Sequence, residues 1–321
     1  MICLIEVLQF LPAITASLDG FLVISYTYVA YVAFANRDIF HPFFSILLSL
    51  LILSYAVSDV FELACCITSI VWPQFAELHD TLYEICEFVY FYASPCVVCL
   101  LLERGIASTR PREYEKARPW KMFWYTQPFC LIIAGAILYA ARWTVSMTDD
   151  VQKAMLFIIQ VVIIILLLSL LTYNKQRTKH SVGMGTNLGT RYQLSENIRA
   201  LRVLLPVVIC DLCVNFADIA SEILFESTTK NDIMGCSNRY AVIFFIIFKS
   251  ISFLFQIMIT FAVMLYHPSF KKARDILHDL LCQTFCTGER KGLIIRNVLG
   301  MKINEKPTGE NYFTGLRQLW Q

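Results

Sequence analysis

Charged side chains inside long apolar runs are the residues of this chain best placed to do chemistry. Lys249 lies in the run from residue 240 to 266, and Glu84, Glu87 and Asp218 lie in two other runs. A charge in a hydrocarbon environment is costly unless it meets an opposite charge or water. We therefore expect Lys249 to form an ion pair with Glu87 or Asp218.

Three interpretations of this polar layer stay open. It could be an interior ion-pair network that only aligns helices. It could be a ligand cavity formed by Glu84, Glu87, Asp218 and Lys249, with aromatic side chains around it. The third is a Schiff base between Lys249 and a chromophore. Further carboxyl groups in the apolar runs belong to Asp19, Asp59, Glu62, Asp211 and Glu222.

A second candidate site is the neighbouring carboxylate and guanidinium of Glu103 and Arg104, where the apolar run 82–102 ends. An arginine at that depth can extend to the interface, pair with its neighbour, or be held under adjacent helices until it is released. In the third case the pair is a switch. A Glu-Arg dipeptide is not specific by itself, so its meaning depends on the helices that position it.

The composition predicts that these helices lie in a bilayer. The chain has 57% hydrophobic and 16% charged residues, with a mean hydropathy of +0.58. That is more apolar surface than a soluble fold of this length needs to bury. Seven apolar segments lie close to the roughly 20 residues that cross a hydrocarbon core. They are 10–34, 43–72, 82–102, 122–141, 155–173, 201–225 and 240–266. We predict an all-α membrane protein with a seven-transmembrane helix bundle.

The basic residues predict how the bundle is oriented. With the amino terminus outside, 22 of the 27 Lys and Arg residues fall in the inner connections and the tail, and four fall in the outer connections. Positive charge resists translocation across the membrane. The amino terminus is therefore expected outside, with the Glu103–Arg104 pair at the cytoplasmic end of the third span.

The segments after the spans have their own pattern. Residues 268–283 carry apolar and basic side chains at helical spacing, which predicts a short amphipathic helix along the membrane surface. Cys282 and Cys286 are candidates for palmitoylation, with reduced thiols as the alternative. We therefore divide the chain into a seven-transmembrane domain, 1–283, and a cytoplasmic tail, 284–321. Before the sixth span, Ser195 is a candidate N-cap of its helix.

The Glu103–Arg104 pair resembles the third-helix signature of rhodopsin-like G-protein-coupled receptors. Ala107 and Pro111 also match that signature, whereas Gly105 replaces its tyrosine. Asp59 resembles the second-span aspartate that can hold sodium in these receptors. Hydrogen bonding to nearby serines is the alternative, and no sodium site is predicted. The usual disulfide to the second outer loop is missing, and whether Cys86 and Cys236 pair stays open.

Three stretches are similar to the nematode serpentine chemoreceptors of the Sra superfamily, most of all to the Sre type. They are 100–108 (LLLERGIAS), Tyr114-Glu115, and the run from Arg191 to Asn197 (RYQLSEN). The resemblance implies a chemosensory receptor that detects an external small molecule and signals to a heterotrimeric G protein. It also implies the plasma membrane, with the ciliary membrane of sensory neurons as a candidate. The residues that it assigns to activation and coupling are Glu103, Arg104, Tyr114, Glu115, Arg191, Tyr192, Glu196 and Asn197.

The sequence argues against an enzyme. The five histidines lie outside the middle of the spans, and no two share the i, i+4 spacing on one helix that favours metal ligation. We predict no cofactor, no metal and no nucleic-acid partner. The alternative function is a transporter or ligand-gated channel, because the polar layer could line a pathway.

Overall fold

The computed structural model describes residues 4–36, 40–72, 74–110, 113–114, 119–143, 149–183, 188–229 and 239–270. The regular structure in these ranges is helical throughout. The helices are α1 (Leu4–Ala35), α2 (Pro42–Val71), α3 (Ala76–Thr109), α5 (Pro119–Trp143), α6 (Asp149–Gly183), α7 (Leu188–Thr229), α8 (Arg239–Tyr266) and the 3₁₀ turn η2 (Pro268–Phe270).

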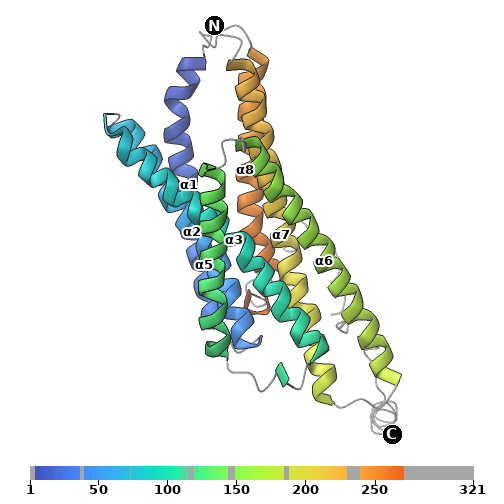
Figure 1. Ribbon diagram of the computed structural model, residues 1–321. Helices are drawn as coiled ribbons and strands as arrows, with labels where there is room; N and C mark the ends of the chain where they lie inside the picture. Colours follow the sequence, from blue (N-terminus) through green and yellow to red (C-terminus); the bar gives the residue numbers. More distant parts are fainter. Residues whose placement is uncertain are drawn as a thin grey trace, which may run out of the picture.

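Seven of these helices are long and apolar enough to cross a membrane. Their candidate spans run from 20 to 33 residues, which matches the thickness of a hydrocarbon core. The helices lie side by side in a bundle (Figure 1). The predicted all-α seven-transmembrane bundle is therefore confirmed.

Contacts between the helices form a closed arrangement. α1 packs on α2 and α8, α2 packs on α3, and α3 packs on α5. α7 packs on both α6 and α8. Because α1 contacts α8, the first and last spans are neighbours, and the bundle closes on itself.

The core of the bundle is built around α2. In its apolar stretch 78% of the residues are buried, against 11% in the stretch of α5. Phe44, Leu47, Leu48 and Leu51 have no exposed surface and belong to one large cluster with side chains of α1, α3 and α7. The exposed apolar side chains of the outer helices face where lipid would lie, so they need no protein partner.

The ends of two helices have clear local causes. α2 begins with Pro42 at its first position, where the missing N–H costs nothing, and the Nδ1 atom of His41 accepts a 3.4 Å hydrogen bond from the Phe43 N–H. α7 begins at Leu188, so the prediction of Ser195 as its N-cap is wrong. Leu194 and Asn197 are both buried, and three-residue spacing on one helical face is what buries them together.

The carboxyl-terminal predictions lie mostly beyond the described residues. η2 covers the first residues of the predicted surface helix, 268–270. Cys282, Cys286 and the tail 284–321 lie outside the described residues, and their roles stay predictions.

Leu51 and Leu53 give a matched test of the packing, because both are leucines of α2 and only Leu51 is buried. We expect Leu51→Ala to lower the free energy of unfolding by about 1–3 kcal/mol, because it opens a cavity between helices. Leu53 is 40% exposed, so Leu53→Ala should change the free energy of unfolding much less. Thermal unfolding of the purified protein in detergent measures both. Equal shifts would contradict the assigned core of α2.

Candidate functional site

The guanidinium of Arg104 is the most enclosed charge that the structure describes. Arg104 lies near the end of α3 and has no exposed surface. Its Nε donates a 2.5 Å hydrogen bond to Glu103 Oε2, and its Nη2 donates to Glu103 Oε1. A guanidinium and a carboxylate joined through two N–H groups form a strong, directional pair. The two neighbours in sequence therefore neutralise each other inside the protein.

Two residues from other segments complete the coordination of Arg104. Asn197 of α7 accepts a 2.9 Å hydrogen bond from Nη1, and the Tyr114 hydroxyl accepts a 2.7 Å bond from Nη2. The same hydroxyl donates to Glu103 Oε1. The ring of Phe44 lies 4.6 Å from the guanidinium carbon, at cation–π distance. We call Glu103, Arg104, Tyr114, Glu196 and Asn197 the Arg104 cluster.

Glu196 joins this cluster to the start of α2. Its Oε1 lies 4.0 Å from Arg104 Nη1 and accepts a 2.6 Å hydrogen bond from the His41 backbone N–H. The His41 ring packs on the Tyr114 ring, with 4.1 Å between centroids. Burial, and then the charge of Arg104, lower the pKa of His41 to about 4. The imidazole is therefore uncharged at neutral pH and adds no positive charge beside the guanidinium.

The Tyr114 hydroxyl is uncharged at neutral pH and keeps its proton. Burial raises the pKa of Tyr114 well above its usual value, and the attraction of Arg104 only partly opposes this effect. A neutral hydroxyl can donate to the carboxylate and accept from the guanidinium at once. Tyr114 therefore bridges the two charges.

Ser108 extends the cluster to α6. Its Oγ accepts hydrogen bonds from Asn174 Nδ2 at 2.9 Å and from Asn197 Nδ2 at 3.3 Å, and donates to the Arg104 carbonyl at 2.7 Å. Arg177 of α6 donates to the Ser108 carbonyl. One hydrogen-bonded network thus joins α3, α6, α7 and Tyr114, and Glu196 of α7 adds a bond to His41 directly before α2.

Five of the eight residues predicted for activation and coupling are thus gathered in the Arg104 cluster. Tyr192 lies on α7 with an exposed side chain. Arg191 is part of α7, but its side chain lies outside the described part of the structure, as does the whole of Glu115. Sequence reasoning missed His41, Phe44, Ser108, Asn174 and Arg177.

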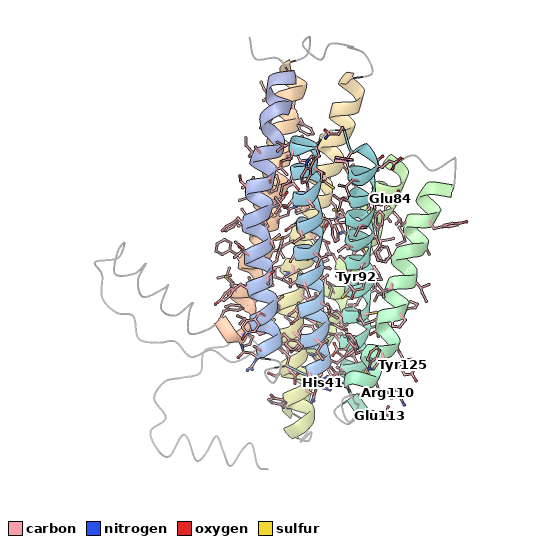
Figure 2. All side chains as sticks on the ribbon, turned by 90° about the vertical axis from the view of Figure 1, so that its left-hand side faces the viewer. His41, Glu84, Tyr92, Arg110, Glu113 and Tyr125 are labelled. Atoms are coloured by element: carbon pink, nitrogen blue, oxygen red, sulfur yellow. The ribbon has the colours of Figure 1, made fainter. Side chains whose placement is uncertain are left out.

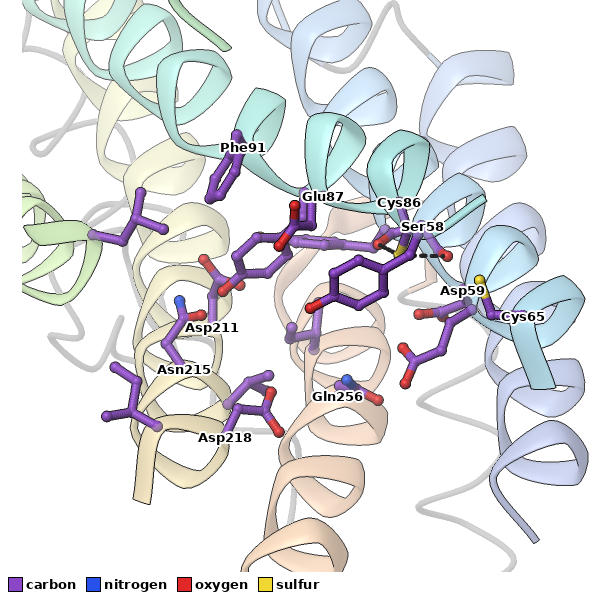
Figure 3. A pocket seen from close by; sticks show the side chains of 18 of the residues that line it. Ser58, Asp59, Cys65, Cys86, Glu87, Phe91, Asp211, Asn215, Asp218 and Gln256 are labelled. Carbon is purple, nitrogen blue, oxygen red and sulfur yellow. Dashed lines mark hydrogen bonds between the residues drawn. The ribbon is translucent and has the colours of Figure 1, made fainter. Parts of the chain in front are cut away.

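A cavity of about 480 Å³ occupies the other half of the bundle. Figure 3 shows it between α2, α3, α7 and α8. Its charged lining residues are Asp59, Glu62, Glu87, Asp211, Asp218 and Lys249. A mixed apolar and polar cavity of this volume is typical of small-molecule sites.

The ion pair expected in this layer is present. Lys249 Nζ lies 3.0 Å from Asp218 Oδ1, and about a third of each side chain is exposed. Asp211 accepts a 2.8 Å hydrogen bond from Gln160 Nε2. The pair joins α7 to α8, and the Gln160 bond joins α6 to α7.

Three of the four residues predicted for the cavity line it, namely Glu87, Asp218 and Lys249. Glu84 does not line it, and its exposed side chain lies near one end of α3 (Figure 2). Glu84 and Glu87 differ by three residues, so the helix turns them toward somewhat different directions. The lining side chains that sequence reasoning missed include Tyr26, Tyr55, Asn215 and Gln256. Asn215 carries a usable signal, because it follows Asp211 by one helical turn.

The cavity is also lined by Asp59 and Cys86, for which the sequence left two interpretations each. Asp59 lines it, and the Asp59 Oδ2 atom is buried without a hydrogen-bond partner among the described residues. The Sγ atom of Cys86 lies 3.5 Å from the hydroxyl oxygen of Ser58. Cys236 lies outside the described ranges, so a Cys86–Cys236 disulfide stays an open prediction.

The cavity and the Arg104 cluster lie toward opposite ends of the bundle and share two helices. On α3, Glu87 precedes Arg104 by about 25 Å at the helical rise per residue. On α7, Asp211 follows Asn197 by about 20 Å at the same rise. Figure 2 shows Glu84 toward one end of the bundle and His41, Arg110 and Glu113 at the other. α3 and α7 therefore each carry residues of both the cavity and the Arg104 cluster.

Comparison with known proteins identifies the family of this bundle. No curated protein matches the chain significantly. The sequence model of the family described as Sre G protein-coupled chemoreceptor matches residues 21–321. The match begins within α1 and includes all of the other six long helices. It therefore covers both the cavity and the Arg104 cluster. The chain is a multi-pass membrane protein that belongs to the Sre G protein-coupled chemoreceptor family.

Proposed function

We propose that this protein binds an external small molecule in the 480 Å³ cavity and signals through the Arg104 cluster to a heterotrimeric G protein. The amino terminus faces the outside, and the Arg104 cluster faces the cytoplasm. The plasma membrane of a sensory cell is the compartment, with the ciliary membrane as the candidate site. The family supports the chemoreceptor role, and the proposal adds the sites and the orientation.

One observation carries the proposal: α3 and α7 each hold residues of both sites. Asp211, Asn215 and Asp218 line the cavity from α7, and Asn197 of the same helix binds the guanidinium of Arg104. On α3, Glu87 lines the cavity and Arg104 belongs to the Arg104 cluster. A ligand that changes the separation of α3 and α7 would therefore strain the 2.9 Å bond between Arg104 and Asn197.

The buried Arg104 cluster supports the assignment of the present arrangement as the inactive state. Arg104 has no exposed surface, and its guanidinium is bonded to the Tyr114 hydroxyl and to Asn197 of α7. A cytoplasmic partner could reach the guanidinium only after the segment of Tyr114 or α7 moves away. Activation is then the separation of these two elements from Arg104, with the released residues available to the G protein.

The orientation can be tested with epitope tags at the two ends of the chain. An odd number of spans places the ends in different compartments, and the distribution of basic residues places the carboxyl end inside. We expect antibodies to label an amino-terminal tag on intact cells and a carboxyl-terminal tag only after permeabilisation. Labelling of both tags in the same compartment would contradict the seven-span topology.

Removal of the Tyr114 hydroxyl should raise basal signalling. Tyr114→Phe deletes the hydroxyl that accepts from Arg104 and donates to Glu103, and a hydrogen bond to a charged group contributes about 1.5–3 kcal/mol. We expect the active fraction without ligand to rise at least about tenfold, because a loss of roughly 1.4 kcal/mol from the inactive state changes the ratio of the two states tenfold. A calcium or cAMP reporter measures it at matched surface expression.

Tyr125→Phe is the control for this variant, because Tyr125 lies on α5 at the same end of the bundle (Figure 2) with a 72% exposed side chain. It should leave basal signalling unchanged. Unchanged signalling in Tyr114→Phe would contradict the role of Tyr114 in holding the inactive state.

Arg104→Ala should abolish ligand-triggered signalling while the receptor still reaches the surface. The substitution removes the group that the G protein is proposed to meet, and the cavity about 25 Å away keeps its residues. We expect ligand binding to persist and reporter activation to disappear. The rival function predicts ligand-dependent current or uptake without any G protein, and that result would replace the receptor proposal.

A further inference from the structure

We infer that the ligand of the cavity is an organic cation, namely a small molecule that carries a protonated amine. The inference rests on the proposed function and names the chemical class that the same cavity would bind. Its first basis is the charge of the lining. Among the described residues, five carboxyl groups and the single ammonium of Lys249 line the cavity, and no arginine or histidine does.

Lys249 is already engaged. Its Nζ lies 3.0 Å from Asp218 Oδ1, so this pair uses one carboxylate and the one ammonium that the described part of the lining contains. An anionic ligand would have to compete with Asp218 for Lys249 and enter beside Asp59, Glu62 and Asp211. A cationic ligand meets attraction from these groups instead, and attraction between charges is strong where water is scarce.

Unpaired buried polar atoms mark where the ligand would bind. Asp59 is 6% exposed, and its Oδ2 has no hydrogen-bond partner in the described structure. Gln256 Oε1 is likewise buried and unpaired among those residues. Both atoms are acceptors and both residues line the cavity. An ammonium group has several N–H donors, so it can satisfy acceptors from α2 and α8 together.

A third unpaired atom indicates a second feature of the ligand. Asn215 is 6% exposed, and its Nδ2 is a donor without a partner within the described ranges. It lines the cavity from α7, in the direction of Asp211 and Asp218 (Figure 3). An unpaired buried donor is costly. A ligand oxygen opposite Asn215 removes that cost, so the best ligand carries an acceptor as well as an amine.

The rest of the lining favours an organic cation over a metal ion. The aromatic rings of Tyr26, Tyr55, Tyr83, Tyr90 and Phe91 line the cavity. Aromatic faces attract alkylammonium groups and also pack against their carbon chains. Among the described residues, no group of three or more His, Cys, Asp and Glu side chains is positioned to hold a metal ion. The 480 Å³ volume also fits a molecule with a carbon skeleton.

The test is direct binding to the purified full-length receptor in nanodiscs of uncharged lipid, without any G protein. The probes are matched sets on one carbon skeleton, such as 2-phenylethylamine, 2-phenylethanol and phenylacetate, or hexylamine, hexanol and hexanoate. A compound that binds the folded state raises the thermal midpoint. We expect the stabilising compounds across many such sets to be amines. Alcohols or acids that stabilise as well as the amines, or the absence of any stabilising amine, would overturn the inference.

Two variants locate the amine within the cavity. Asp59→Asn should weaken binding of the stabilising amines about 10- to 100-fold, because it removes their charge partner. The control Asp80→Asn changes a carboxylate whose side chain is 78% exposed at the start of α3, and it should leave amine binding unchanged. Amine binding that is equally strong in Asp59→Asn and the wild-type protein would refute the assignment of Asp59.

Asn215→Leu provides a second measurement in case Asp59→Asn does not fold. This variant should weaken binding of amino alcohols more than binding of the corresponding plain amines. Equal effects on both would overturn the role of Asn215. The binding assay also separates the two proposals. Ligand-triggered signalling that persists in Arg104→Ala would refute the coupling proposal alone, whereas an agonist that is neutral or acidic would refute the ligand class alone.

Discussion

The fold depends on a positive charge that is enclosed where the apolar part of α3 ends. A guanidinium without water needs a partner for its charge and for its N–H groups. Glu103 supplies the charge, while Tyr114 and Asn197 supply further acceptors. These partners come from three different segments, and Ser108 brings α6 to the same place. Packing in lipid lacks a strong apolar driving force between helices, so such a polar network determines how this end of the bundle is arranged.

Close-packed apolar side chains of α3 and α7 lie between the cavity and the Arg104 cluster. Between the cavity and Arg104, Val97 and Leu100 of α3 are buried in the same cluster as Leu204 and Val208 of α7. Close-packed side chains do not compress, so they transmit displacement rather than absorb it. The helices can therefore shift relative to one another as units, and the hydrogen bonds at the Arg104 end are the contacts that such a shift would break.

The parts that could be predicted from the sequence are those on which the bilayer imposes a pattern. Hydrocarbon thickness requires apolar stretches of about 20 residues, which is why the seven spans were predictable. The cost of an isolated charge also made an ion pair of Lys249 predictable, with Glu87 or Asp218 as its partner, and the structure shows Asp218. No periodic pattern marks His41, Ser108 or Asn174 as partners of one cluster, because their proximity arises only when the helices pack. The start of α7 at Leu188, before Ser195, was missed as well, because the burial of Leu194 arises only when the helices pack.

The difference in exposure between the two sites limits how a ligand can act. The Lys249–Asp218 pair is about a third exposed, whereas Arg104 and Asn197 are fully buried. Breaking a bond between enclosed groups costs more than rearranging partly hydrated ones. A ligand shifts an equilibrium only by the difference in its affinity for the two states. Tight binding to the cavity as it stands would therefore leave Arg104 enclosed, and an effective agonist must bind better after α7 has moved. Asp59 Oδ2 on α2 and Asn215 Nδ2 on α7, which lack hydrogen-bond partners among the described residues, are atoms whose separation such a movement would change.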